Sequence, residues 1–359
     1  TALTGGTRLA GYGDNQEQYQ ALLGAGAAYA KEFGLSLGVG LTAEQMASLT
    51  TDIVLLVDVV VEGPNGPTHA LAPIVYLAKT HEGDLQESGA LIAAGGQLSI
   101  RSAGDLTNSG VIRASLGSDI AVEGRLTNAG TIAGGKVATI TAGGDLISQG
   151  GSFTGGDLTL SAGGNMVLGA TRSTQHSATA YAGGGTLTDS ITHQVTTVDA
   201  TGKLTLVALG DLTAAGAKLS AGDSATLVAG GNITLGAVTD VTHVQAIDRS
   251  AKGTSAGSAT SQTALGTSLA AANGITVQTG GALALIGSTI QTRDEKGGQI
   301  TLAAGQGITI GAAQQDWSSD QYDRAGKKRS VATSSSGTTN LLSSIDAAAG
   351  LTITTPGAV

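Results

Sequence analysis

The acidic side chains are the residues whose chemistry would suit catalysis, but their spacing argues against it. A polysaccharide-cleaving β-protein needs carboxylates grouped with Lys or Arg on one strand face or in one groove. Asp105 and Asp145 instead follow glycines at equivalent turn positions of a repeat, and Arg125 occupies the position between them. Turn formation or edge capping explains such residues better. We therefore expect no enzymatic activity and no cofactor, with a carbohydrate-active β-helix enzyme as the alternative.

Metal, thiol and phosphate chemistry have no better support. The chain has no cysteine, which excludes disulfides and cysteine-bound zinc. Its five histidines are scattered. His193 and His243 would approach one another only if the polar segments that carry them stack, so we expect no metal site. Residues 326–330 lack the preceding glycine and strand of a phosphate-binding loop.

Contact with a partner is the chemistry that remains. Trp317 and Tyr322 are candidate exposed aromatics in one polar segment, whose tip carries the basic residues Lys327, Lys328 and Arg329. Such a tip suits an anionic lipid or polysaccharide, although three charges are commonly just a solvated turn. We take these five residues as a candidate contact surface.

Composition restricts the fold that positions these residues. Of the 359 residues, 57 are glycine, 41 % are apolar, 13 % are charged and 3 % are aromatic. The low aromatic content disfavours a large globular core, and the high apolar content disfavours a disordered chain. The net charge of −9 argues against a nucleic-acid partner. The chain opens on a threonine without a signal peptide, so we expect a piece of a longer protein.

A repeat of about 20 residues runs through most of the chain. The apolar residues Leu106, Leu126, Leu146 and Met166 recur with it, each two residues after a glycine. Each period holds short runs of alternating apolar residues, which predict one coil of a β-solenoid. We predict a mainly β fold, a right-handed parallel β-helix of about eight or nine coils. In this fold the four residues form one inward ladder.

Two asparagines recur with the same period. Asn108 and Asn128 stand in the phrases Leu-Thr-Asn-Ser-Gly and Leu-Thr-Asn-Ala-Gly, at the expected corners of successive coils. Stacked asparagines hydrogen-bond along a stack of strands. We therefore assign them a structural role in the ladder.

Three polar inserts rich in Ser, Thr and Ala interrupt the ladder, near residues 171–200, 238–272 and 313–347. The first has two polar alternating strands around a glycine turn, the pattern of a hairpin. Two coils separate successive inserts, and two coils rise about 9.6 Å, which is also the thickness of a two-stranded hairpin. We therefore predict that the inserts stack edge to edge into a lateral sheet.

Residues 1–80 differ from the repeats and predict a small α/β module, followed by the β-helix over 81–359. The open end of a β-solenoid leaves strand edges unpaired, so we expect this module to cap the repeats. Its predicted elements are a helix from Asp14 to Gly34, a helix opened by the capping box of Thr42 and Gln45, a helical turn at Thr51–Asp52, and strands over 57–62 and 68–78.

The module also carries a resemblance to a known family. Its segments Tyr19-Gln-Ala-Leu-Leu and Leu41-Thr-Ala-Glu-Gln-Met46, and the later Ala72-Pro-Ile-Val-Tyr76, resemble a segment of filamentous haemagglutinins. These are two-partner-secreted exoproteins, and the likeness is greatest to the contact-dependent growth inhibition effectors. The phrases Ala142-Gly-Gly-Asp-Leu146 and Ala229-Gly-Gly-Asn-Ile233 are similar to the family's haemagglutinin repeats. The resemblance covers nearly the whole chain.

The resemblance implies a middle piece of a very long secreted exoprotein. Such a protein crosses the outer membrane through a partner translocator barrel and forms a rod on the bacterial cell surface. Within it, this chain resembles the pre-repeat module and the second haemagglutinin-repeat block, which helps deliver a C-terminal toxin at the target cell's outer membrane. A structural and adhesive stalk segment is therefore expected, with a plain adhesin without toxin as a further alternative. The lack of cysteine suits a chain that is threaded unfolded through a pore.

Overall fold

The computed structural model describes residues 15–42, 45, 49, 51–63, 66–76, 90–250, 252–325 and 329–357. The chain divides into two compact units, Thr1–Ser88 and Gly89–Val359. Some of the predicted features lie outside the described residues, namely Asp14, the strand residues 77–78, and Lys327 and Lys328 at the basic tip.

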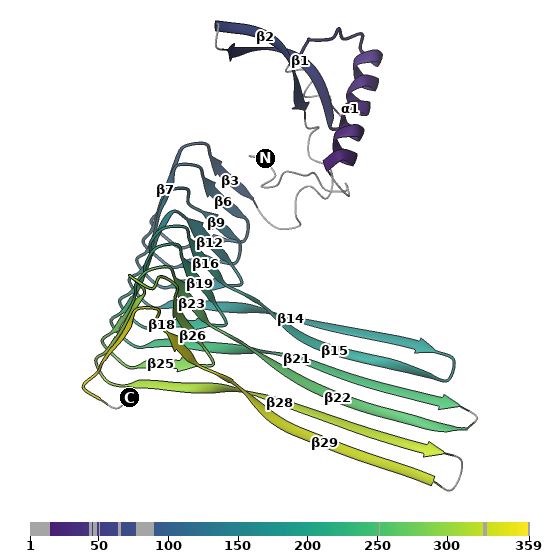
Figure 1. Ribbon diagram of the computed structural model, residues 1–359, viewed down its shortest axis with the longest axis vertical. Helices are drawn as coiled ribbons and strands as arrows, with labels where there is room; N and C mark the ends of the chain where they lie inside the picture. Colours follow the sequence, from purple (N-terminus) through teal and green to yellow (C-terminus); the bar gives the residue numbers. More distant parts are fainter. Residues whose placement is uncertain are drawn as a thin grey trace. The chain divides into compact units, whose positions relative to one another are not determined.

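In the described part of the second unit, three walls of parallel strands wind into a β-solenoid (Figure 1). Each strand inside a wall pairs with its equivalent one coil earlier and one coil later, so the chain passes each wall once per coil. The prediction of a mainly β, parallel β-helix is confirmed. The right-handed winding stays a prediction.

The walls are built from short strands that recur in a fixed order. The first wall contains β3 (Leu91–Ala94), β6 (Val111–Ala114), β9 (Thr131–Ala133), β12 (Ser152–Gly155), β16 (Thr197–Ala200), β19 (Lys218–Ala221), β23 (Ser268–Ala271), β26 (Thr289–Thr292) and β30 (Ser344–Asp346). The second contains β4 (Gln97–Ser102), β7 (Gly117–Val122), β10 (Val137–Ala142), β13 (Asp157–Ala162), β17 (Leu204–Ala208), β20 (Ala225–Ala229), β24 (Ile275–Thr279), β27 (Gln299–Ala304) and β31 (Gly350–Thr354). The third contains β5 (Leu106–Asn108), β8 (Leu126–Asn128), β11 (Leu146–Gln149), β14 (Met166–Tyr181), β18 (Leu212–Ala215), β21 (Ile233–Ser250), β25 (Leu283–Ile286) and β28 (Ile308–Ala325).

Inward side chains of the third wall stack in a continuous column. Leu126 pairs in register with Leu106 on one side and Leu146 on the other, and Leu146 pairs with Met166. Leu126, Leu146 and Met166 are each 0 % exposed. Burial of each such side chain contributes about 1.5–3 kcal/mol. The column continues through Leu212, Ile233, Leu283 and Ile308.

The corner that follows the third wall differs between plain coils and coils that extend into a hairpin. Beside each hairpin-bearing coil, the plain coil turns at a glycine with a φ of 61–69°, namely Gly150, Gly216 or Gly287. The aligned residue of the hairpin-bearing coil is an alanine in an extended strand, namely Ala170, Ala237 or Ala312. Only glycine adopts this left-handed φ without strain. At this corner, glycine is therefore found where the coil closes, and alanine is found where the strand extends into a hairpin.

The described part of the first unit contains the helix α1 (Asn15–Glu32) and an antiparallel pair of strands, β1 (Ile53–Gly63) and β2 (Gly66–Tyr76). The predicted capping box is confirmed, because the Thr42 backbone N–H donates to Gln45 Oε1 over 2.9 Å and the Gln45 N–H donates to Thr42 Oγ1 over 3.2 Å. Within the described residues, no helix is both long enough and apolar enough to span a membrane.

The packing of α1 against β1 explains one correct and one wrong prediction. A Cβ on Gly26 would lie 2.0 Å from the backbone oxygen of Val54, so this helical glycine permits close approach of the helix to the strand. The predicted helical turn at Thr51–Asp52 is wrong, because neither residue is helical. β1 starts directly after them at Ile53, which is 1 % exposed and packs in the small core of this unit. Burial of the strand thus overrides the local capping signal.

Candidate contact surface

Each insert is an antiparallel hairpin that prolongs a strand of the third wall. β14 pairs with β15 (Gly184–Val195), β21 with β22 (Gly253–Gly266), and β28 with β29 (Arg329–Leu342). β15 also pairs with β21, and β22 with β28, again antiparallel. Within the described residues, six strands therefore form one sheet beside the solenoid, in the order β14-β15-β21-β22-β28-β29 (Figure 1). The predicted edge-to-edge stacking of the hairpins is confirmed.

The coil spacing makes this lateral sheet continuous. In the third wall, β18 lies between β14 and β21, and β25 lies between β21 and β28. Hairpins therefore start two coils apart, or about 9.6 Å along the solenoid, which matches the two strands of a hairpin. Each returning strand consequently meets the next outgoing strand at pairing distance.

The pairing register defines two rows of side chains that cross one face of the sheet. Cross-strand partners share a face because strand side chains alternate with a period of two. The row nearer the solenoid contains Ala178, Leu187, Gln245, Ser258, Asp320 and Ser334. The row nearer the tips contains Ala180, Gly185, Ile247, Ala256, Tyr322 and Ala332.

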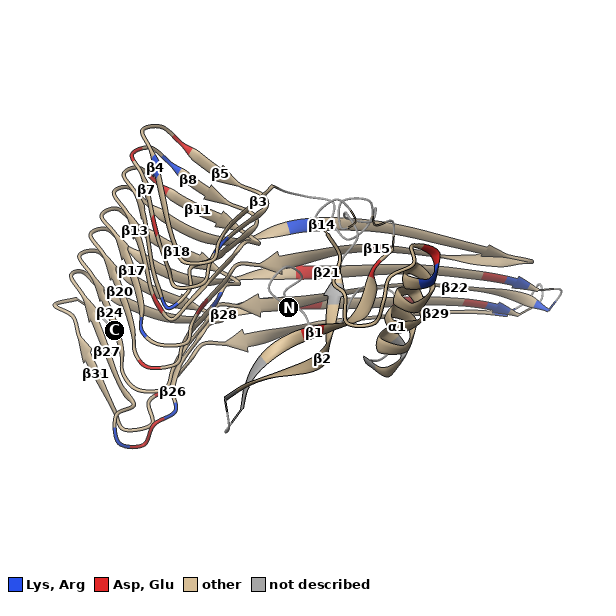
Figure 2. Ribbon diagram, turned by 90° about the horizontal axis from the view of Figure 1, so that it is seen from above, with Lys and Arg blue, Asp and Glu red and all other residues tan. Residues whose placement is uncertain are grey.

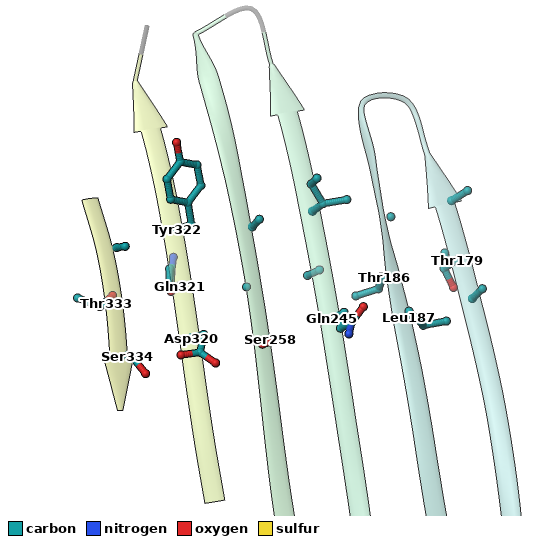
Figure 3. A pocket seen from close by; sticks show the side chains of 18 residues that line it. Thr179, Thr186, Leu187, Gln245, Ser258, Asp320, Gln321, Tyr322, Thr333 and Ser334 are labelled. Carbon is teal, nitrogen blue, oxygen red and sulfur yellow. The ribbon is translucent and has the colours of Figure 1, made fainter. Parts of the chain in front are cut away.

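These two rows line an open groove of about 810 Å³. Leu187, Gln245, Ser258, Asp320 and Ser334 stand side by side on successive strands, and Tyr322 lies next to them toward the tips (Figure 3). Leu187, Ile247 and Tyr322 supply its large apolar surface, and Asp320 is the one charged group among the described lining residues. The groove is therefore a mainly apolar, weakly charged surface that small side chains leave accessible.

The aromatic candidates do not form one patch. Tyr322 and Trp317 are 40 % and 41 % exposed, respectively, but they are an odd number of positions apart on β28 and project from opposite faces. Trp317 lies directly opposite Gly337, and a Cβ at that glycine would be 2.8 Å from the indole Nε1. Arg329 begins β29 at the tip, opposite Ala325.

Charge is concentrated toward the ends of the second and third hairpins. Figure 2 shows Lys, Arg, Asp and Glu near these tips and little charge over the middle of the sheet. The tip residues include Asp248, Arg249, Lys252, Asp323, Arg324 and Arg329. Both signs are present, so the described tip residues do not form a purely basic patch.

Histidines of the inserts make structural contacts in the sheet. His193 Nδ1 lies 2.9 Å from Asp240 Oδ1 and so links the first hairpin to the second. His243 Nδ1 lies 2.8 Å from Thr260 Oγ1, within the second hairpin. His193 and His243 therefore have separate partners, and no group of three His, Asp or Glu among the described residues is placed to hold a metal ion.

Acidic residues of the coils cap the backbone of the next coil. The Arg125 backbone N–H donates to Asp105 Oδ1 over 2.8 Å, and the Asn165 N–H donates to Asp145 Oδ1 over 2.9 Å. Arg125 also places its guanidinium 3.8 Å from the Asp145 carboxylate. The predicted edge-capping role of Asp105 and Asp145 is confirmed, and these carboxylates do not gather into an acid–base pair.

One ion pair of the coils shifts the ionisation of its partners. Arg101 on β4 donates a hydrogen bond to the carboxylate of Asp119 on β7. This hydrogen bond lowers the pKa of Asp119 and raises the pKa of Arg101. Both side chains are more than half exposed, so the pair marks a surface contact between adjacent coils rather than a buried site.

The partners of Tyr322 in the groove were not identified from the sequence. Leu187 and Ile247 come from other hairpins and reach Tyr322 only through the pairing of β15 with β21 and of β22 with β28. The available signal was alternation. Leu187 and Ile247 are large apolar residues at comparable distances from their hairpin turns.

Comparison with known families identifies the repeats. The family described as "Hemagglutinin repeat" matches residues 121–185 and 177–251, and the family described as "Haemagglutinin repeat" matches residues 76–110. The matched segments include the whole first hairpin and the outgoing strand β21 of the second. No solved structure matches the chain.

Several curated proteins are similar to part of the chain. "Toxin CdiA" of Yersinia pestis is 42 % identical over 121 residues, which are 34 % of this chain and 4 % of that protein. "tRNA nuclease CdiA-2" of Burkholderia pseudomallei (strain 1026b) is 37 % identical over 114 residues, 32 % of this chain and 3 % of that protein. "tRNA nuclease CdiA" of Yersinia mollaretii is 41 % identical over 110 residues, 31 % of this chain and 3 % of that protein.

The matches therefore span only 3–4 % of the length of these relatives. The repeat matches, the similar CdiA proteins and the parallel walls of short strands agree with one another. This chain belongs to the filamentous haemagglutinin and contact-dependent growth inhibition exoprotein family, as a segment of its haemagglutinin-repeat stalk.

Proposed function

We propose that the chain is the pre-repeat module and second haemagglutinin-repeat block of a large secreted growth-inhibition effector. In this role it acts as a structural and adhesive stalk on the bacterial cell surface and helps deliver a C-terminal toxin at the outer membrane of a target cell. The observation that carries the proposal is the similarity to CdiA proteins in a chain that also contains a self-stacking repeat. Its partners in this proposal are an outer-membrane translocator barrel during secretion and the target-cell surface afterwards.

A mechanical rather than catalytic role is supported by the names of the relatives. Similar proteins are named as a tRNA nuclease and as a deoxyribonuclease, which are different activities. Each shares only 3–4 % of its length with this chain, so the shared segment does not distinguish one activity from the other. Acid–base cleavage of a glycoside also needs two carboxyl groups, whereas the described groove residues offer only Asp320.

The lateral sheet supplies the contact surface in this proposal. Of the residues singled out from the sequence, Tyr322 lies in the groove, Trp317 covers part of the opposite face and Arg329 stands at the tip. Lys327 and Lys328 belong to the same tip in the sequence. We assign target contact first to the Tyr322 face, because Leu187 and Ile247 extend its apolar surface across several strands.

We also propose that the α/β module, residues 1–80, caps the repeats of 81–359. In the second unit, Ile92 of the first coil is 44 % exposed, and Leu98, Ile100 and Leu106 are only partly buried. Equivalent positions in later coils are almost fully buried. The first coil thus leaves apolar surface in water, and covering it would stabilise the repeats by about 25 cal/mol per Å² of apolar area removed from water. A chain that starts at residue 89 should therefore unfold at lower denaturant concentration and bind more hydrophobic dye than the full chain.

The delivery role is tested by removing the repeats from the full-length exoprotein in its own bacterium. An in-frame deletion of residues 90–357 should leave secretion and cell-surface display unchanged and abolish growth inhibition of susceptible neighbours in co-culture. If inhibition persists at the parental level, the delivery role is wrong. If binding to target cells is lost although the parental protein shows no inhibition, the plain adhesin is the better description.

The contact surface has a matched pair of variants on one sheet. Tyr322→Ala removes the ring from the groove face, and Tyr181→Ala removes an exposed ring that projects from the opposite face. We expect Tyr322→Ala to weaken binding of the purified chain to target cells at least about fivefold, a loss of roughly 1 kcal/mol. Tyr181→Ala should bind like the parent. Equal binding by all three proteins would place the contact elsewhere.

The enzymatic alternative has a direct readout. The purified chain is incubated with cell-surface polysaccharides, and new reducing ends or unsaturated sugar products are measured over time. We expect none above the level of a boiled control. Product formation that Asp320→Asn abolishes would instead establish a carbohydrate-active enzyme.

A further inference from the structure

Returning strands of the hairpins use their outer edges in a regular way. β15 pairs on one side with β14 of its own hairpin and on the other with β21, the outgoing strand of the next hairpin. β22 repeats this arrangement between β21 and β28. β29 is the third returning strand, and among the described residues it pairs only with β28. Its outer edge is thus the unused equivalent of an interface that the fold builds twice.

The outer edge of β29 lacks the features that normally prevent edge pairing. The strand is 14 residues long and pairs with β28 without a break from Ala312↔Leu342 to Ala325↔Arg329. Between Ser330 and Leu342 it contains neither a charged residue nor a proline. Exposed edges in soluble proteins are usually interrupted by lysines, prolines or bulges. An uninterrupted, uncharged edge of this length is suited to accept another strand.

Direction and spacing define the strand that fits. Strands of the lateral sheet alternate outgoing and returning, so the neighbour of β29 must be an outgoing strand that pairs antiparallel. Hairpins start every second coil, because β18 and β25 separate the hairpin-bearing strands. We propose that the outer edge of β29 docks the outgoing strand of a further hairpin of the same class, which leaves the same solenoid two coils beyond β28.

A second copy of the chain fits this edge less well. Its free outgoing strand is β14, which follows coils that already contain β5, β8 and β11 in the same wall. If β14 of a second copy paired with β29 and the two solenoids were collinear, the coils before that β14 would overlap the first copy. They would occupy the space of β28 and of the coil that follows it. A hairpin on the same polypeptide also loses little translational freedom on docking, whereas a second copy loses several kcal/mol. The strand that docks at this edge therefore belongs to the same solenoid.

The consequence is a sheet that grows with the repeats. Each further pair of coils adds two strands beside the solenoid, so the area of the lateral sheet scales with the number of hairpin-bearing coils. This inference concerns the architecture of the repeat block and holds whether or not the block delivers a toxin.

The test extends the full chain by its own repeats. β31 pairs with β27, and Leu283 pairs with Ile308, so residue 358 aligns with residue 307 and with residue 282. Replacing residues 358–359 with a duplicate of 282–357 therefore adds one plain coil and then a second copy of the β28–β29 hairpin. A matched control adds only a duplicate of 307–357, which places that hairpin one coil too early.

Two measurements report docking. Hydrogen exchange of the backbone amides of residues 330–342 should slow at least about tenfold in the two-coil extension relative to the original chain. By analogy with Gly253↔Ala325, Ser335 should face the duplicated Ser319. Because the chain has no cysteine, Ser335→Cys with duplicated Ser319→Cys should form a disulfide on mild oxidation. Pairing Ser335→Cys with duplicated Gln314→Cys should not, since that site lies several residues away along the strand.

The outcomes separate cleanly. Protection of β29 and the specific disulfide in the two-coil extension, without either in the one-coil control, support the proposal. Unchanged exchange in β29, while the duplicated hairpin protects its own two strands, overturns it. Concentration-dependent self-association of the original chain with protection of β29, seen by sedimentation and exchange, would show that a second copy takes the edge and would also overturn it.

Discussion

Asn108 donates a hydrogen bond from its side-chain amide to the side-chain oxygen of Asn128 over 2.8 Å, one coil away. Asn128 is 0 % exposed, and its own amide donates to the Ser152 backbone oxygen over 3.2 Å. A buried amide between two coils therefore satisfies a polar side chain on one side and a backbone carbonyl on the other. The two asparagines singled out as stacked in the sequence lie in contact as neighbouring members of one column.

Removal of the central amide should destabilise the coils. Asn128→Leu keeps a similar volume but leaves the Asn108 amide and the Ser152 carbonyl without this partner. We expect the free energy of unfolding to fall by about 1–3 kcal/mol, the cost of unsatisfied buried polar groups. Urea denaturation followed by circular dichroism measures it, with Ser109→Ala in the adjacent exposed turn as the control. Equal stability of the two variants would contradict a structural role for the stack.

The corner glycines offer a second test. Gly216 has a φ of 68°, and a Cβ there would lie 2.7 Å from Val238 Cγ2 of the next hairpin. Gly216→Ala should cost about 1–2 kcal/mol of stability from the left-handed backbone alone. Gly236→Ala is the matched control, because Gly236 lies in the extended strand of the neighbouring coil and its added Cβ would meet nothing closer than 3.9 Å. Urea midpoints compare the two, and a loss as large at Gly236 as at Gly216 would show that backbone conformation is not the cause.

The β-solenoid could be predicted because its determinants are local and repeated. Alternation fixes which side of each strand points inward, and the fixed period brings Leu106, Leu126 and Leu146 into one column. The stacked hairpins followed from a match of two lengths, the rise of two coils and the thickness of two strands. These inferences need no knowledge of contacts between distant side chains.

The groove could not be predicted in the same way. Its position depends on the register between hairpins, and that register is set by where each hairpin leaves the solenoid and how the strands twist. A shift of one residue in the pairing of β15 with β21 would move Ile247 to the other face from Leu187. The opposite projection of Trp317 and Tyr322, by contrast, follows from their odd spacing and was available from the sequence.

Carboxylates and amides alternate in the capping column, and this alternation should matter. Asp145 Oδ1 accepts from the Asn165 N–H, and Asn165 Oδ1 accepts from the Asp211 N–H, both over 2.9 Å. Asn165→Asp would place a third carboxylate between two others at the strand spacing of about 4.8 Å. We expect a loss of about 0.5–1 kcal/mol at low salt, because like charges face one another across strands.

Salt distinguishes charge repulsion from other causes of that loss. The deficit of Asn165→Asp should shrink at high salt, because salt screens the repulsion between exposed carboxylates. Asn232→Asp is the control, since it adjoins Asp211 on one side and the uncharged Ala282 on the other. It should lose about half as much. A deficit that is insensitive to salt would point to a lost amide contact instead of repulsion.

The Arg101–Asp119 pair predicts a pH dependence of stability. Its hydrogen bond lowers the pKa of Asp119 in the folded chain. The pair therefore adds stability above the ordinary aspartate pKa of about 3.9, and this stability is lost as the pH falls through the lowered folded value. Asp119→Asn should have a slightly lower thermal midpoint than the parent near neutral pH, and the difference should vanish in acid. The same pattern is expected for Arg101→Gln, and an unchanged difference in acid would exclude the pair as its source.

The single tryptophan makes the far face of the lateral sheet observable. Trp317 lies opposite Gly337, where the absence of a side chain leaves room for the indole between neighbouring strands. Gly337→Thr adds a Cβ that would approach the indole to 2.8–3.0 Å, so the ring must swing outward into water. Threonine suits a strand better than glycine, and the two effects leave the expected change in stability within about 1 kcal/mol. The fluorescence emission of Trp317 should shift to the red, and the indole should become more accessible to a soluble quencher.

The control is Ser335→Thr on the same strand. It should leave both properties unchanged, because Ser335 pairs with Ser319 and not with Trp317. If Gly337→Thr leaves the emission as it was, the indole does not rest on the glycine, and the tryptophan is free to contact a partner without displacement from the sheet.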